Sequence, residues 1–198
     1  KKIKKIKKNK KTFTSKLYEN IMDRLGFNLT NDQINVLKEI NNDLSSQSKM
    51  FRLLQGDVGS GKTIVSLLSS LNVIESGYQV AFMAPTEILA SQHYNLAKKI
   101  FPKRINIDIL SNKIDVPKKK IIIENLKNNK IHIIFGTHAI FQKKIIFKNL
   151  GFIIIDEQHK FGVRQRKLLS DKGGKNCDIL LMSATPIPRT LTMSIYGD

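Results

Sequence analysis

The stretch FRLLQGDVGSGKT, residues 51–63, joins a short apolar run to a glycine-rich turn. Its last eight residues fit the pattern G-x-x-x-x-G-K-[ST] at every position, and a helical pattern follows. Glycines let the backbone wrap a phosphate without Cβ clashes, while successive N–H groups and the helix N-terminus point at the anion. The stretch therefore predicts a nucleoside triphosphate site. Its candidate residues are the loop residues Gly56, Asp57, Gly59, Ser60 and Gly61, with Lys62 on the β/γ-phosphates and Thr63 on Mg²⁺.

From this loop onward, apolar runs alternate with helical patterns. The runs are continuous and not alternating, which is typical of parallel strands that are buried on both faces. We therefore expect an α/β fold with a mostly parallel sheet flanked by helices. The expected strands are residues 51–54, 79–84, 105–110, 131–135, 152–155 and 179–182. The expected helices are residues 13–23, 30–40, 63–76, 86–99 and 117–129, with a polar loop at 44–49.

Composition limits the class of protein. The chain has 198 residues, and its single cysteine, Cys177, excludes an internal disulfide framework. No apolar run is long enough to cross a membrane, and no export signal is visible, so we expect a cytoplasmic protein. The net charge is +18, of which residues 1–11 contribute eight lysines. That block predicts a solvated, disordered flank. The remaining +10 is compatible with an attraction to nucleic acid or with a general compositional bias toward lysine, which leaves both interpretations open.

Adjacent carboxylates follow the apolar run at residues 152–155. Asp156 is a candidate for holding Mg²⁺ and Glu157 for polarising the attacking water, which are separate tasks in nucleotide hydrolysis. Both would lie at the carboxyl edge of a parallel sheet, where the phosphate loop also lies. Ser183 and Thr185 follow the last expected strand and could hydrogen-bond His159 in response to the nucleotide.

Further segments accompany these motifs: APTEILASQH at 84–93, GTHA at 136–139, DEQHKFGVRQR at 156–166 and SATPIPRT at 183–190. In this order the chain resembles the superfamily 2 helicases, and within them the RecG family of bacterial replication-fork helicases. Gln158 favours that family, because the transcription-repair coupling and replication-restart helicases usually carry Asp-Glu-Glu-His at this box. Lys160 and Ser183 depart from the commonest family residues but keep the chemistry.

The resemblance implies a three-layer RecA-like P-loop domain. Residues 1–12 would be a basic flank, 13–49 a helical lead-in with a Q motif, and 50–198 the first motor domain. In the lead-in, Phe27 and Gln33 would contact the adenine of ATP. The implied catalytic residues are Lys62, Asp156 and Glu157, and the implied coupling residues are Gln158, His159, Ser183 and Thr185. The implied DNA-backbone contacts are Thr86, Thr137, His138, Arg164 and Arg166, although the two arginines could equally belong to a solvated helix face.

The function implied by this resemblance is ATP binding and hydrolysis with Mg²⁺, used to remodel branched DNA and stalled forks in recombination and repair. The DNA contacts would not be sequence-specific. An N-terminal wedge domain and a second motor domain would lie outside the sequence, since only thirteen residues follow Thr185, and full activity would require them. The alternatives are the motor domain of a transcription-repair coupling or replication-restart helicase, or a DNA-binding module that does not hydrolyse ATP.

Overall fold

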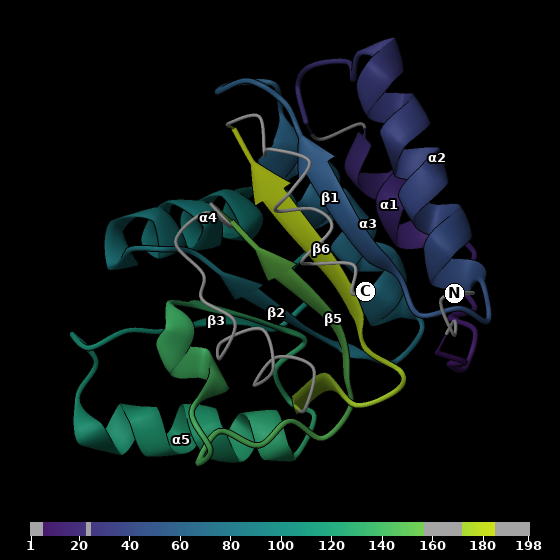
Figure 1. Cartoon of the computed structure of the whole chain (residues 1–198). Helices are drawn as coiled ribbons and strands as arrows, with labels where there is room; N and C mark the ends of the chain where they lie inside the picture. Colours follow the sequence, from purple (N-terminus) through teal and green to yellow (C-terminus); the bar gives the residue numbers. More distant parts are fainter. Residues whose placement is uncertain (1–5, 23–24, 157–171, 185–198) are drawn as a thin grey trace, which may run out of the picture.

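Six parallel strands form one sheet at the centre of the molecule (Figure 1). The computed structural model describes residues 6–22, 25–156 and 172–184. The strands are β1 (Phe51–Gln55), β2 (Gln79–Met83), β3 (Ile107–Leu110), β4 (Ile133–Gly136), β5 (Leu150–Ile155) and β6 (Asp178–Ser183). Their order across the sheet is β1-β6-β5-β2-β4-β3, and every pair is parallel. Each of the six expected strands is therefore present.

Both faces of the sheet are covered, as the continuous apolar runs predicted. On β5, Phe152 and Ile154 belong to one apolar cluster, whereas Ile153 and Ile155 belong to the other. Because side chains of a strand alternate between faces, the two clusters are two cores separated by the sheet. The first core contains residues of α1 (Lys16–Met22), α2 (Asn31–Ser45), α3 (Lys62–Glu75) and α4 (Glu87–Ile100). The second contains residues of α5 (Val116–Lys127) and the 3₁₀ helix η1 (His138–Phe141), which gives three layers (Figure 1).

Helix and strand ends follow local hydrogen bonds. Thr30 caps α2 in a reciprocal capping box with Gln33, and Thr86 caps α4 by accepting from Leu89 N–H. Strand β3 begins two residues later than expected, because the Ile105 N–H is used in a turn to the Pro102 carbonyl at 2.9 Å. Helix α2 continues to Ser45, two residues into the segment that was expected to be a loop.

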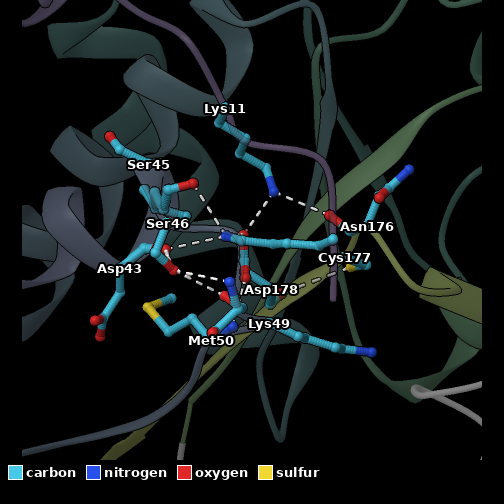
Figure 2. A network of polar contacts seen from close by, with 12 residues as sticks. Lys11, Asp43, Ser45, Ser46, Lys49, Met50, Asn176, Cys177 and Asp178 are labelled. Carbon is cyan, nitrogen blue, oxygen red and sulfur yellow. Dashed lines mark hydrogen bonds and ion pairs between the residues drawn. The ribbon is translucent and has the colours of Figure 1, made fainter. Parts of the chain in front are cut away.

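The basic N-terminal segment differs from its prediction. Residues 6–14, here called the N-terminal strap, lie along the end of α2 and the start of the sheet, with Lys8 N–H bonded to the Gln47 carbonyl. The side chains of Lys8 and Lys11 are fully buried, and both Nζ atoms lie 2.6 Å from Asp178 Oδ2 (Figure 2). Thr14 then contacts the Glu75 carboxylate. The expected solvated flank is therefore wrong for Lys8 and Lys11, whereas Lys7 and Lys10 are exposed; residues 1–5 lie outside the described chain.

The carboxyl ends of the strands bring the predicted motifs to one edge of the sheet. Along that edge the order of strands places the phosphate loop after β1, Ser183 at the end of β6 and Asp156 after β5. The segments that begin α4 and η1 follow β2 and β4, which are the next strands in the sheet. The expected nucleotide motifs are thus neighbours, and the expected DNA motifs continue the same edge.

Candidate functional site

The phosphate loop connects β1 to α3. Gly59 and Gly61 have φ angles of 81° and 85°, a backbone conformation that favours glycine. Gly61 is also the N-cap of α3 and offers no side-chain cap, so the first N–H groups of the helix remain available to an anion. A Cβ at Gly61 would be strained by this φ angle and would also force the amide of Gln33 to move. The loop therefore has the conformation that its sequence predicted.

Lys62 lies within the curve of this loop. Its Nζ donates to the carbonyl oxygens of Gly56 and Asp57 at 2.6 and 2.8 Å. The ammonium group is thereby held beside the backbone that a phosphate would contact. The Gly56 N–H in turn donates to the Ser183 carbonyl at 3.3 Å, which links the loop to the end of β6.

Gln33 connects the start of α2 to the phosphate loop. Its Oε1 accepts from Thr30 N–H at 2.9 Å, and its Nε2 donates to the Ser60 carbonyl at 2.9 Å. A cavity of about 490 Å³ lies between the two elements. It is lined by Thr30, Asp32, Gln33, Val36, Leu54, Gln55, Gly56, Asp57, Gly59, Ser60, Lys62 and Val65. Six of the nine residues predicted to bind the nucleotide therefore surround one hollow, whereas Gly61, Thr63 and the half-exposed Phe27 are not in its lining.

Asp156 stands at the carboxyl end of β5, and its main chain continues the sheet through a hydrogen bond from its N–H to the Met83 carbonyl. Its Oδ2 lies 2.8 Å from His93 Nε2. Its Oδ1 has no hydrogen-bond partner among the described residues. A carboxylate oxygen here and the Thr63 hydroxyl at the start of α3 are hard oxygen donors, the type that Mg²⁺ prefers. The residues present therefore fit a magnesium ion.

His93 is a site residue that the sequence analysis did not single out. It lies on the buried face of α4 with Ala90, Ala97 and Ile100. A histidine on such an apolar face needs a polar partner, and this was the available signal. The side chain is 10% exposed, and the centre of its ring lies 4.8 Å from that of Phe82.

The predicted DNA contacts lie on the adjoining part of the edge. Thr86 is exposed at the start of α4, and His138 is exposed at the start of η1. Thr137 is only 8% exposed, so its side chain offers less surface to a ligand than expected. Six further predicted residues lie outside the described residues: Glu157, Gln158, His159, Arg164, Arg166 and Thr185.

Comparison with known protein families gives a match to the DEAD/DEAH box helicases over residues 30–194. The chain belongs to the DEAD/DEAH box helicase family. It is 52% identical to the ATP-dependent DNA helicase RecG of Aquifex aeolicus over 99% of this chain, and 50% identical to RecG of Borreliella burgdorferi over 96%. The chain spans 25% and 28% of those two relatives. The resemblance to RecG inferred from the motifs is confirmed.

Solved structures of this family have the same fold. A structure of RecG bound to a three-way DNA junction matches 96% of this chain with a TM-score of 0.84 and 44% identity, over 26% of that chain. A DEAD box protein from Methanococcus jannaschii matches 89% of this chain and 49% of its own, with a TM-score of 0.67 at 22% identity, which shows the fold alone. The predicted RecA-like P-loop fold is therefore confirmed. Within residues 6–22, 25–156 and 172–184, none of the helices has the length and apolar character needed to span a bilayer.

Proposed function

We propose that this chain is the ATP-binding and hydrolysing first motor domain of a DNA helicase that remodels branched DNA in recombination and repair. The observation that carries the proposal is the shared cavity between the start of α2 and the phosphate loop, with Asp156 two strands away on the same edge. The RecG relatives, one of them solved on a three-way DNA junction, supply the substrate class. A wedge domain and a second motor domain would complete the protein.

In this proposal the phosphate loop binds the triphosphate through its N–H groups and Lys62. Gln33 and Phe27 contact the adenine. Thr63 and Asp156 hold Mg²⁺, which neutralises charge on the phosphates. Glu157 accepts the proton of the attacking water.

DNA binds at the other half of the edge. Thr86, Thr137 and His138, together with Arg164 and Arg166, contact the phosphate backbone and read no sequence. The four coupling residues (Gln158, His159, Ser183 and Thr185) connect the state of the nucleotide to that DNA surface. Ser183 supports this role by position, since β6 lies between β1 and β5 and its end accepts a hydrogen bond from the phosphate loop.

Calorimetric titration of the chain with ATP and Mg²⁺ tests the nucleotide site. Lys62→Ala should weaken binding about 10- to 100-fold, the effect expected from losing one or two charge-assisted hydrogen bonds. Lys38→Ala removes the same charge from an exposed position of α2 and should bind ATP like the parent chain. Equal affinity of Lys62→Ala and Lys38→Ala would contradict the proposed site.

Turnover separates a hydrolase from a module that only binds. In a protein that contains both motor domains, Glu157→Gln should still bind ATP but lose about 10²-fold or more in DNA-stimulated hydrolysis. A parent protein that binds ATP and branched DNA without hydrolysis would favour the alternative of a DNA-binding module.

A further inference from the structure

One buried contact joins the proposed metal site to α4. His93 Nε2 lies 2.8 Å from Asp156 Oδ2, and the two side chains are 10% and 13% exposed. An ionised carboxylate only accepts hydrogen bonds, so His93 Nε2 carries the hydrogen and donates it. Burial of this contact protects it from competition with water.

The imidazole has little freedom to turn. Its ring packs at 4.8 Å against Phe82, and the ring of Phe82 stacks at 5.2 Å on that of Phe135. Phe82 comes from β2, which pairs with β5, and Phe135 comes from β4, which pairs with β2 on its other edge. The donor is therefore held by the core, and the carboxylate must orient toward it.

This arrangement divides the two oxygens of Asp156. Oδ2 is committed to His93, while Oδ1 has no partner among the described residues. A fixed hydrogen bond to one oxygen orients a carboxylate, so that the other oxygen faces a constant direction. Sequence position alone placed Asp156 at the edge of the sheet but could not say which oxygen is available.

We propose that His93 is the positioning residue for Asp156: it fixes the carboxylate so that Oδ1 is presented to Mg²⁺ of the bound nucleotide. This inference rests on the proposed ATP site and adds a residue to it. Groups that orient a metal ligand typically contribute 10- to 100-fold to metal affinity. His93 should therefore act on the Mg²⁺ dependence of nucleotide binding and not on nucleotide binding itself.

Two substitutions separate the hydrogen bond from the packing. His93→Phe keeps an aromatic ring against Phe82 but removes the donor. His93→Gln removes the ring but keeps an N–H donor, because the amide Nε2 of glutamine is three bonds from Cβ, like the Nε2 of histidine. If His93→Phe does not fold, as judged by circular dichroism, His93→Asn takes its place, since its shorter amide cannot reach Oδ2.

The measurement is calorimetric ATP affinity of the whole chain in EDTA and across a series of Mg²⁺ concentrations. The variant without the donor (His93→Phe, or His93→Asn in its place) should bind ATP in EDTA with the affinity of the parent. It should need about 10-fold or more Mg²⁺ than the parent to reach the same gain in ATP affinity. His93→Gln should restore most of that gain. Unchanged Mg²⁺ dependence in the donor-free variant would overturn the proposal, as would an equal loss in EDTA, which would indicate a purely structural role.

The parent chain distinguishes the two possible failures. If the parent chain binds ATP more tightly with Mg²⁺, and the His93 variants show the same Mg²⁺ dependence as the parent, only the role of His93 fails. If it does not bind ATP, or gains nothing from Mg²⁺, the proposed function fails, and the role of His93 fails with it.

Discussion

At the scale of single residues, Gln33 uses only part of its hydrogen-bonding capacity within the protein. An amide has two hydrogens on nitrogen and two lone pairs on oxygen. One hydrogen goes to the Ser60 carbonyl and one lone pair accepts from Thr30. One donor and one acceptor are left, the pair needed to bind the edge of an adenine. Gln33 can therefore support the phosphate loop and contact a base together.

We predict that Gln33→Ala weakens ATP binding more than it weakens binding of inorganic tripolyphosphate. Both ligands lose the support that the amide gives to the loop, and only ATP also loses the base contact. Calorimetry with the two ligands measures the difference, and Asn35→Ala, exposed on the same helix, is the control. Equal losses for the two ligands would mean that Gln33 acts on the loop alone.

The residues of the site differ in how far sequence could predict them. The phosphate loop and Asp156 were predictable because their residue types and spacing follow directly from the chemistry of a triphosphate. His93 was not, because its role depends on a contact between residues 63 positions apart. The burial of Thr137 could not be predicted either, since the exposure of one side chain at a strand end depends on the packing around it.

At the scale of elements, Thr86 has two separable roles. Its hydroxyl caps α4 by accepting from Leu89 N–H, and its exposed position is a proposed contact with DNA phosphate. Aspartate caps a helix about as well as threonine, whereas alanine does not. Aspartate would also repel a phosphate.

We predict that Thr86→Ala lowers the free energy of unfolding by about 1 kcal/mol, while Thr86→Asp leaves it near the parent value. Thr86→Asp should nevertheless weaken DNA binding. Urea denaturation and fluorescence anisotropy with a branched DNA measure the two effects. Unchanged DNA affinity in Thr86→Asp would show that the start of α4 does not contact the bound DNA.

A neutral histidine links the residues that directly precede β3 and β4. His132 Nδ1 accepts from Asn106 N–H at 2.8 Å, and burial lowers the pKa of His132 below 6.5. The unfolded chain takes up a proton as pH falls through about 6.5, whereas the folded chain resists it. Stability is therefore lost as pH falls from 6.5 toward the lowered folded pKa.

We predict that His132→Asn reduces this loss, because its amide oxygen can replace Nδ1 as the acceptor without binding a proton. Urea midpoints of both proteins between pH 7.5 and 5.5 provide the test, and titrations elsewhere in the chain cancel in the comparison. Parallel curves for the two proteins would exclude His132 as the source.

The strands were the most predictable elements, since an apolar run that is covered on both faces has few alternatives. The N-terminal strap was the least predictable. Eight lysines among eleven residues are typical of a solvated segment, and nothing local shows that two of them reach Asp178. Its conformation is decided by a partner at the other end of the chain.

At the scale of the whole molecule, the buried cluster of Lys8, Lys11 and Asp178 has two positive charges and one negative charge. Burial lowers the pKa of Lys8, although the Asp178 carboxylate opposes this. Carbonyl oxygens of Asp43 and Leu44 accept from Lys8, the Asn176 carbonyl accepts from Lys11 (Figure 2), and Lys11 Nζ also lies 5.0 Å from the centre of the Tyr78 ring. Among the described residues, Asp178 is the only carboxylate in contact with the two buried ammonium groups, while the Asp43 carboxylate acts on Lys8 from farther away.

We predict that Asp178→Asn destabilises the fold by about 3–5 kcal/mol, because it leaves both buried ammonium groups without a carboxylate in contact. Lys8→Met should cost less, since Lys11 and Asp178 then remain as a neutral pair. Urea denaturation of the two variants provides the comparison. A cost of Lys8→Met equal to that of Asp178→Asn would show that packing, and not charge, dominates the cluster.

The same cluster has a consequence for the order of events during synthesis. Lys8 and Asp178 are separated by 170 positions. At about 5–20 residues per second, a ribosome needs roughly 8–34 s between adding the first and the second of these residues. During that interval the strap has no carboxylate to enclose, and its lysines stay in water. Closure of the strap therefore reports that β6 has been made and has entered the sheet, so a protease that cleaves near residue 8 would distinguish nascent chains that lack β6 from chains that contain it.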